Sequence, residues 1–159
     1  MLGAAAAGKT TIGRALAARH GWRFVDGDDF HTREAIAKMR AGGGLTDAER
    51  RPWLASLHAV VATAIDRREA LVLACSALKQ RYRDTLRDSL RPVRFVYLKA
   101  DAATLRRRLE QRASHFAGPA LLTTQLADLE EPDDPLTLTI DATRPPEQIL
   151  DAIDDEFGL

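Results

Sequence analysis

The sequence has little cysteine and no long apolar run. Cys75 is the only cysteine among the 159 residues, which excludes an internal disulfide and is typical of a reducing compartment. No apolar stretch approaches the length of a membrane span, and the N-terminus lacks the layout of a signal peptide. We therefore expect a cytoplasmic protein without a membrane partner, folded as one domain over residues 1–159.

Neither sign of charge predominates. Lys plus Arg and Asp plus Glu both number 23, so no overall field would attract nucleic acid, and any anion site has to be local. We expect no nucleic-acid partner. Apolar residues at 45% and charged residues at 29% are ordinary values for a globular protein.

One glycine-rich motif lies close to the N-terminus. Gly3, Gly8, Lys9 and Thr10 have the spacing of a phosphate-binding loop, with four alanines between the two glycines. In such a loop, backbone N–H groups at the start of a helix surround a polyphosphate. We expect Lys9 to reach the β- and γ-phosphates and the Thr10 hydroxyl to bind Mg²⁺. The predicted phosphate-binding residues of this segment are Gly3, Ala4, Ala5, Ala6, Ala7, Gly8, Lys9, Thr10 and Thr11.

The motif lacks the strand that ordinarily precedes it. Only Met1 and Leu2 stand before Gly3, too few for the buried central strand of a parallel sheet. Two explanations stay open, a start codon assigned too far downstream and a real truncation. Without this strand its two neighbours would have open edges, and the lost apolar burial would cost on the order of several kcal/mol at ~25 cal/mol/Å².

Short apolar runs alternate with stretches of helical periodicity along the rest of the chain. Strands are expected at 22–25, 71–75, 93–98 and 136–140, and helices at about 11–19, 30–40, 47–68, 79–90, 101–112, 121–129 and 146–157. This alternation predicts an α/β domain whose parallel sheet is covered by helices on both faces. Ligands of such sheets bind at the carboxyl ends of the strands.

Two aspartates follow the expected strand at 22–25. In an extended segment Asp26 and Asp28 would point the same way, towards the phosphates. Phosphoryl transfer needs a positioned Mg²⁺ and a carboxylate that orients or deprotonates the attacking hydroxyl. We assign Asp26 to the magnesium environment and Asp28 to the acceptor hydroxyl. An ordinary solvated acidic turn is the alternative.

Two arginines near the end of the helix at 101–112 are spaced i, i+4. Arg108 and Arg112 can share one helix face, and guanidinium groups neutralise charge on a transferring phosphoryl group. The weakly periodic residues that follow predict a mobile lid at about 113–120. For most other arginines a solvated helix face is the better interpretation. The histidines and Cys75 have no metal-ligand spacing, so zinc is not expected.

Further motifs extend over nearly the whole chain. They include Asp26-Gly27-Asp28-Asp29-Phe30-His31, Lys38-Met39, Leu45-Thr46-Asp47, Pro52-Trp53-Leu54, Cys75-Ser76-Ala77-Leu78-Lys79 and Leu129-Glu130-Glu131-Pro132. In this order they resemble the gluconokinase family of P-loop small-molecule kinases. The resemblance implies an adenylate- or shikimate-kinase-like three-layer P-loop NTPase fold, with the first strand truncated to Met1-Leu2. It also implies a cytoplasmic homodimer that uses ATP and Mg²⁺ to phosphorylate D-gluconate at the 6-hydroxyl.

The resemblance implies roles for individual side chains. Lys9, Asp28 and Arg112 would be catalytic, and Arg108 and Arg112 would contact the phosphates. A sugar acid needs many hydrogen-bond partners and one cation for its carboxylate. The candidates for substrate binding are Asp28, His31, Lys38, Arg50, Lys79, Arg83 and Gln125, and which basic residue meets the carboxylate stays open.

The chain departs from the family pattern at several positions. Alanines fill the loop where glycine and serine are usual, and a positive φ at Ala6 would be strained. Ala35 stands where asparagine is usual, which removes a polar side chain beside the acceptor. Two alternatives therefore stay open. One is another small-molecule P-loop kinase of the shikimate type, and the other is a degenerate nucleotide-binding protein with little turnover because the first strand is missing.

Overall fold

The computed structural model describes residues 1–89, 92–111 and 118–159. Strands and helices alternate along these residues as the sequence predicts. The strands are β1 (Arg23–Asp26), β2 (Leu71–Ala74), β3 (Phe95–Lys99) and β4 (Thr137–Asp141). The helices are α1 (Lys9–His20), the 3₁₀ helix η1 (Gly27–Phe30), α2 (Arg33–Arg40), α3 (Asp47–Asp66), α4 (Gln80–Arg87), α5 (Ala102–Glu110), α6 (Pro119–Asp128) and α7 (Pro146–Phe157).

The N-terminal residues join two parallel strand pairs into one sheet. β1 pairs with β2 and β3 pairs with β4. Between the pairs, the Met1 ammonium donates to the Leu73 carbonyl at 2.8 Å, and the Cys75 N–H donates to the Met1 carbonyl at 3.0 Å. Leu2 forms a parallel bridge with Tyr97 of β3. The order is therefore β1-β2-(Met1-Leu2)-β3-β4, with Met1 and Leu2 in the central position of the parallel sheet.

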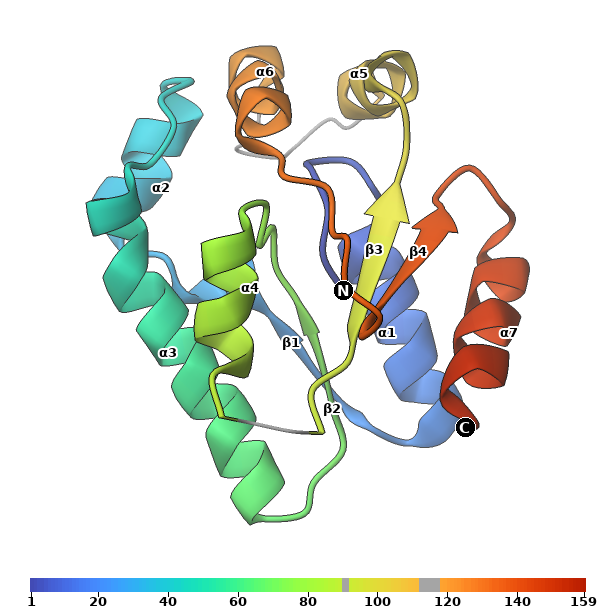
Figure 1. The fold of residues 1–159 in the computed structure, drawn as a ribbon. Helices are drawn as coiled ribbons and strands as arrows, with labels where there is room; N and C mark the ends of the chain where they lie inside the picture. Colours follow the sequence, from blue (N-terminus) through green and yellow to red (C-terminus); the bar gives the residue numbers. More distant parts are fainter. Residues whose placement is uncertain (90–91, 112–117) are drawn as a thin grey trace.

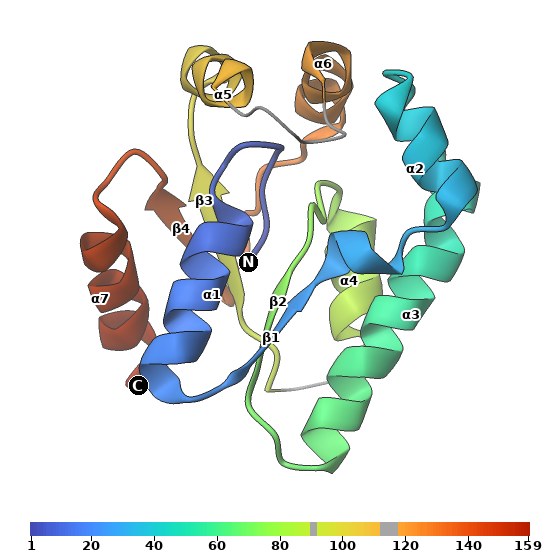
Figure 2. The ribbon, with the colours of Figure 1, turned by 180° about the vertical axis from the view of Figure 1, so that it is seen from behind.

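Helices cover both faces of this sheet. In Figures 1 and 2, α1 and α7 lie on one face and α3 and α4 on the other, while α5 and α6 lie beyond the carboxyl ends of β3 and β4. Each face has its own apolar core: Met1 packs with Leu16 and Ile153 in one, and Leu2 packs with Leu57 and Tyr97 in the other. This is the predicted three-layer α/β arrangement. Among the described residues, no helix is long and apolar enough to cross a membrane.

Local signals place most helix ends where the sequence predicts them. Thr46 and Glu49 form the expected capping box at the start of α3, and Asp101 caps α5 by accepting from the Thr104 N–H at 2.7 Å. α6 begins at Pro119, two residues earlier than expected, because proline suits the first helical turn. The end of the predicted lid at about 113–120 is therefore helical.

The predicted helix at 30–40 is wrong in its first part. Residues 27–30 form η1, and α2 begins only at Arg33. The Thr32 hydroxyl accepts from the Ala35 N–H at 3.2 Å, and Thr32 itself is extended, so it acts as an N-cap that separates the two helices. α4 also ends early, at Arg87, because Asp88 takes a positive φ of 29°.

Candidate active site

The glycine-rich loop turns from Leu2 into α1 through three residues of positive φ. These are Gly3 at 141°, Ala6 at 63° and Gly8 at 98°. A Cβ on Gly3 would lie 2.9 Å from the Leu98 carbonyl oxygen, so only glycine fits there. Gly8 caps α1 without a side-chain hydrogen bond, which leaves the N–H groups of the first helical turn for an anion.

Ala6 has the positive φ that the sequence analysis described as strained for alanine. A left-handed φ brings the Cβ of an L-residue close to its own backbone and costs roughly 1–2 kcal/mol. The neighbouring Ala4, Ala5 and Ala7 do not share the positive φ and are buried. The loop keeps its shape despite the alanine, because the packing of these neighbours holds it in place.

Two polar side chains at the start of α1 form hydrogen bonds at or near the loop. Lys9 Nζ donates to the Ala4 carbonyl at 2.9 Å, so the ammonium lies over the loop that it would serve. Thr10 Oγ1 donates to Asp26 Oδ2 at 2.9 Å and ties the first turn of α1 to the end of β1. Thr11 follows in the same turn and is exposed.

Thr10 and Asp26 present a hydroxyl and a carboxylate side by side. Mg²⁺ prefers such oxygen ligands and usually takes only one or two from the protein, the rest coming from phosphates and water. Among residues 1–89, 92–111 and 118–159, no group of three or more His, Cys, Asp or Glu side chains could hold a metal ion. The Thr10 hydroxyl and the Asp26 carboxylate are the kind of oxygen ligands that suit Mg²⁺ bound to a nucleotide.

Asp28 lies in η1 and not in the extended segment that the sequence predicted. β1 ends at Asp26, whose Oδ1 accepts from the Asp28 N–H at 3.1 Å and so caps the new turn. The indole N–H of Trp53 donates to the Gly27 carbonyl at 2.7 Å, which fixes η1 against α3. The Asp28 carboxylate is 39% exposed, and its Oδ1 lies 3.9 Å from His31 Nε2.

His31 is held in a buried stack. Its ring lies on that of Trp53, with centroids 4.6 Å apart and planes inclined by 11°, and its side chain is only 4% exposed. Burial, and then the positive charge of Arg50, lowers the pKa of His31 to about 4. The imidazole is therefore neutral at pH 7 and can exchange hydrogen bonds with a hydroxyl, but it is no cation for a carboxylate.

Arg50 is a buried cation beside this stack. It is 3% exposed, its Nε donates to the Leu45 carbonyl at 3.2 Å, and its guanidinium carbon lies 5.7 Å from the centroid of the Tyr82 ring. Within the part of the chain that the structure describes, no ion pair includes Arg50. Buried charges in proteins are ordinarily paired, so this guanidinium is suited to an anionic ligand.

The other basic candidates have partners within the protein. Lys38 Nζ lies 2.8 Å from both carboxylate oxygens of Glu49, and Lys79 Nζ lies 3.0 Å from Asp128. Arg83 is buried and donates to two backbone carbonyls of the turn before α4, both at 3.1 Å. The structure therefore does not bring Arg83 to the group around Asp28.

Gln125 and Arg108 contact backbone near the loop. Gln125 Oε1 of α6 accepts from the Ala5 N–H at 2.7 Å, a contact with the phosphate loop that the sequence did not predict. Arg108 of α5 donates to the Ala142 carbonyl after β4 at 2.7 Å. Arg112 and most of the predicted lid lie outside the described residues.

Sequence reasoning did not assign Trp53 or Tyr82 to the site. Trp53 carries the His31 stack and anchors η1, and the Tyr82 hydroxyl donates to Asp47 while its ring faces Arg50. Both are buried, so helical periodicity alone marks them as core. For Trp53, the Pro52-Trp53-Leu54 motif was the feature of the sequence that could have indicated a place in the site.

Cys75 has the properties expected of a buried strand thiol. It is buried, and that burial raises its pKa to about 11. A thiol with such a pKa is almost entirely protonated at pH 7 and is a poor nucleophile. Its backbone N–H donates to the Met1 carbonyl at 3.0 Å.

The fold and the loop define a class, the P-loop kinases. The family model described as "AAA domain" matches residues 1–132. At lower similarity, the APS kinase of Mycobacterium tuberculosis superimposes with a TM-score of 0.68 at 19% identity, over 99% of this chain and 95% of that chain, which shows the fold alone.

Three of the more similar relatives are named gluconokinases. The gluconokinase of Gluconobacter oxydans is 38% identical over 158 residues, 99% of this chain and 89% of the relative. The thermosensitive gluconokinase of Escherichia coli is 39% identical over 132 residues, 83% of this chain and 71% of the relative. The structure of a gluconokinase from Sinorhizobium meliloti has a TM-score of 0.87 at 37% identity, over 99% of this chain and 89% of that chain. An unliganded sugar kinase from Janibacter sp. reaches 0.93, also at 37% identity, over 99% and 91%. The chain belongs to the gluconokinase family.

Proposed function

We propose that this protein transfers the γ-phosphoryl group of ATP to the 6-hydroxyl of D-gluconate. The products are ADP and 6-phospho-D-gluconate. The observation that supports this most directly is the identity to gluconokinases of 38% over 99% of the chain, which includes both the loop and the segment around Asp28. The comparisons contain nothing that favours a shikimate-type acceptor.

We assign the binding of the ATP phosphates to the glycine-rich loop. Backbone N–H groups of residues 3–11 would surround the β- and γ-phosphates, and Lys9 would leave the Ala4 carbonyl to reach them. Mg²⁺ would be held by the Thr10 hydroxyl and, through water, by Asp26, and it would neutralise charge on the phosphate oxygens. We assign Arg108 and Arg112 to the same phosphates, with Lys9, Asp28 and Arg112 as the catalytic set.

We assign the binding of the gluconate 6-hydroxyl to residues in and next to η1. The oxygen of the 6-hydroxyl forms the new bond to the γ-phosphorus, while the bond from this phosphorus to the bridging oxygen of ADP breaks. Asp28 takes the hydroxyl proton, which suits a carboxylate that is 39% exposed in η1, directly after β1. Neutral His31 donates or accepts a hydrogen bond with another substrate hydroxyl.

Arg50 is our choice for the substrate carboxylate. Lys38 and Lys79 already have carboxylate partners, and Arg83 donates to two backbone carbonyls. Arg50 is buried beside His31 with one bond from Nε to the Leu45 carbonyl and without a carboxylate partner in the described part of the chain. Its guanidinium can bind a carboxylate through two parallel hydrogen bonds. Lys38, Lys79 and Gln125 would then contact hydroxyls at the edge of the site.

The family resemblance extends the proposal to assembly and location. We propose a homodimer in the cytoplasm, with D-gluconate as the small-molecule partner. Size-exclusion chromatography with light scattering tests the dimer, and a monomer at micromolar concentration would contradict it.

A substrate panel tests the reaction. The purified protein is incubated with ATP and Mg²⁺ and with D-gluconate, shikimate or D-glucose, ADP release is measured, and phosphorus NMR locates the new phosphate. We expect turnover with D-gluconate and a phosphate on O6. A Lys9→Ala variant, which should lose most of this turnover, controls for contaminating kinases. Phosphorylation of shikimate but not of gluconate would contradict the proposal, and ATP binding without any turnover would identify a degenerate protein.

A further inference from the structure

Arg83 of α4 is a buried arginine that bonds to the start of its own helix. It is 1% exposed, and its Nη1 donates to the carbonyls of Ala77 and Leu78, both at 3.1 Å. Its Nη2 and Nε donate to Gln80 Oε1 at 2.8 and 3.3 Å. A guanidinium has five N–H donors, so these four hydrogen bonds leave at most one donor for a ligand.

The segment that Arg83 binds, residues 75–79, is the β2–α4 turn. Within it Ala77 has a φ of 38° and is fully buried. L-residues other than glycine rarely adopt such a positive φ, because the Cβ approaches the backbone. The two carbonyls that accept from Arg83 are those of Ala77 and the next residue, Leu78. Arg83 therefore bonds to the turn at the point where its backbone is strained.

The β2–α4 turn lies between the two halves of the kinase site. On one side, the Ser76 carbonyl accepts from the N–H of Gly3 in the phosphate loop at 3.3 Å. On the other side is η1, where a Cβ on Gly27 would lie 2.9 Å from the Ala74 carbonyl oxygen and 3.0 Å from the Cys75 Cβ. The backbone of η1 thus packs directly on the end of β2 and the start of the turn. The shape of this short segment sets the separation of the phosphate loop from η1.

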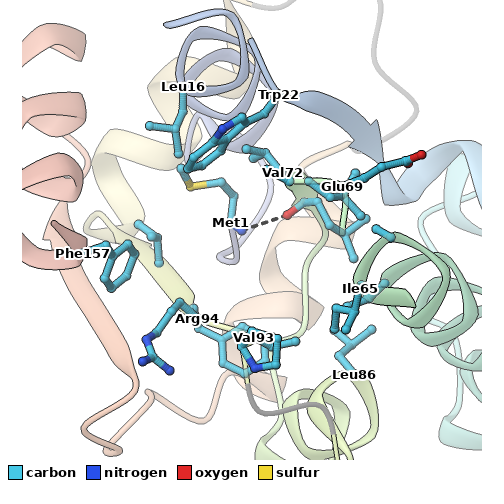
Figure 3. Close-up of a pocket in the computed structure, with 18 of the residues that line it drawn as sticks. Met1, Leu16, Trp22, Ile65, Glu69, Val72, Leu86, Val93, Arg94 and Phe157 are labelled. Carbon is cyan, nitrogen blue, oxygen red and sulfur yellow. Dashed lines mark hydrogen bonds between the residues drawn. The ribbon is translucent and has the colours of Figure 1, made fainter. Parts of the chain in front are cut away.

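An apolar cavity of about 570 Å³ borders both the turn and α4. Cys75 of the turn and Leu86 of α4 line it, next to Met1 (Figure 3). Side chains at a cavity lack contact atoms on one side, so they gain less from packing than side chains in a filled core. We therefore expect the position of the turn against α4 to depend on hydrogen bonds such as those of Arg83.

We propose that Arg83 is a positioning residue for phosphoryl transfer, which holds the β2–α4 turn in the shape that aligns the phosphate loop with η1. The inference rests on the proposed function, because this alignment decides how the 6-hydroxyl meets the γ-phosphorus. A displacement of about 1 Å between reacting groups can lower a rate by about 100-fold. Arg83 acts through the turn and contacts neither substrate, in contrast to the substrate contact that the family resemblance implied.

The experiment compares the parent with Arg83→Met, Ala77→Gly and the double variant of both. Steady-state kinetics give kcat and the KM values for ATP and gluconate, and thermal unfolding establishes that each variant folds. Without substrates, hydrogen exchange followed by NMR gives the protection of the Gly3 amide, which donates to the turn. Arg81→Met is the matched control, since Arg81 lies on the same helix with its side chain 58% exposed.

We expect Arg83→Met to lower kcat by on the order of 10- to 100-fold, with both KM values within about threefold of the parent. Exchange of the Gly3 amide should become at least about tenfold faster. Ala77→Gly alone and Arg81→Met should keep the parent kcat within about twofold. In the double variant, kcat should recover by about fivefold or more, because glycine adopts a φ of 38° without strain.

The recovery in the double variant separates positioning from general stability. A purely structural arginine would lower the Tm, and a glycine substitution would not restore kcat. If Arg83→Met alone does not fold, a folded double variant supports the proposal, and failure of both to fold overturns it.

Three further results would overturn the proposal. The first is a raised KM for gluconate with an unchanged kcat, which would make Arg83 a substrate contact. The second is an equal loss of kcat in Arg83→Met and in the double variant. The third is parent-like exchange of the Gly3 amide in folded Arg83→Met. If the parent itself does not phosphorylate gluconate, the proposed function fails, and the Gly3 exchange rates still decide whether Arg83 holds the turn.

Discussion

The Thr10 hydroxyl donates to Asp26 Oδ2 at 2.9 Å, which links the helix after the phosphate loop to the strand that leads to Asp28. The second oxygen of the same carboxylate accepts from the Asp28 backbone at 3.1 Å. One carboxylate therefore positions both the hydroxyl assigned to Mg²⁺ and the turn that holds the proposed base. Removing the charge of Asp26 should weaken the binding of Mg²⁺ more than it disturbs the protein, because the negative charge serves the metal.

Asp26→Asn should raise the Mg²⁺ concentration needed for half-maximal activity by on the order of tenfold. The amide oxygen can still accept from Thr10, but the negative charge near the metal is gone, and the amide nitrogen cannot accept from the Asp28 N–H. Activity measured against free Mg²⁺ at saturating ATP tests this. Thr10→Ser, which keeps the hydroxyl, should stay close to the parent, and an unchanged Mg²⁺ dependence in Asp26→Asn would exclude Asp26 from the magnesium environment.

Ala6→Gly should stabilise the folded protein. Glycine removes the strain of φ 63°, worth roughly 1–2 kcal/mol, and part of this gain is offset by the larger backbone entropy of glycine in the unfolded chain. The net effect should be a rise in Tm of about 1–4 °C, measured by calorimetry. Ala5→Gly, at a position without positive φ, should lower the Tm, and a fall with both substitutions would show that Ala6 is not strained.

His31 should make stability depend on pH between about 6.5 and 4. Its folded pKa of about 4 lies below the ordinary value of 6.5, so the unfolded chain binds a proton in this range that the folded protein does not. The contribution of neutral His31 is fully present above pH 6.5 and is lost as the pH falls to 4.

Urea unfolding of the parent and of His31→Gln across this range measures the effect. The slope of the free energy of unfolding against pH should be smaller in the variant. Glu49 provides a comparison, because Lys38 holds its pKa at about 2, so its contribution should be lost only as the pH falls below about 4.5. Equal slopes for His31→Gln and the parent would show that His31 is not buried in its neutral form.

The features predicted correctly from the sequence depend on neighbours in the chain. The capping box of Thr46 and Glu49 joins residues three apart, and Asp101 caps its helix over the same spacing. The phosphate loop likewise lies within eight consecutive residues, and both of its glycines have a positive φ. Each of these is a local geometry with a small set of suitable residues.

The features that the sequence did not predict depend on contacts between distant segments. Gln125 meets Ala5 across 120 positions, and Trp53 meets Gly27 across 26. Arg83 and Arg50 are the same residue type on neighbouring helices, yet one binds the turn before its own helix and the other faces His31. Composition and periodicity do not separate two such arginines, since tertiary packing decides which partner each one meets.

Gln125→Ala should strengthen ATP binding. Gln125 Oε1 accepts from the Ala5 N–H, which belongs to the loop assigned to the phosphates. A phosphate that binds this N–H has to displace the Gln125 side chain. A neutral hydrogen bond contributes a net 0.5–1.5 kcal/mol, which corresponds to a decrease in the Kd for ATP of about two- to tenfold. Calorimetric titration measures it, with Thr124→Ala as the control, since that hydroxyl donates to the Ala120 carbonyl of the same helix. Weaker ATP binding in Gln125→Ala would show instead that Gln125 supports the loop.

Arg50→Met should raise the KM for gluconate by on the order of 100-fold and leave the KM for ATP nearly unchanged. The guanidinium is buried among His31, Tyr82 and the Leu45 carbonyl, where a substrate carboxylate would be bound with little screening by water. Steady-state kinetics with each substrate varied in turn separate the two constants.

Two controls make the Arg50 result specific. Arg51→Met changes the adjacent, exposed arginine and should leave both constants unaltered. Arg50→Lys keeps a charge without the two-pronged geometry and should recover only part of the affinity. Circular dichroism and the Tm establish that the variants fold. If folded Arg50→Met kept the parent KM for gluconate, the carboxylate would have to bind elsewhere, and Lys79, 3.0 Å from Asp128 but beside the same Tyr82 ring, would be the next residue to substitute.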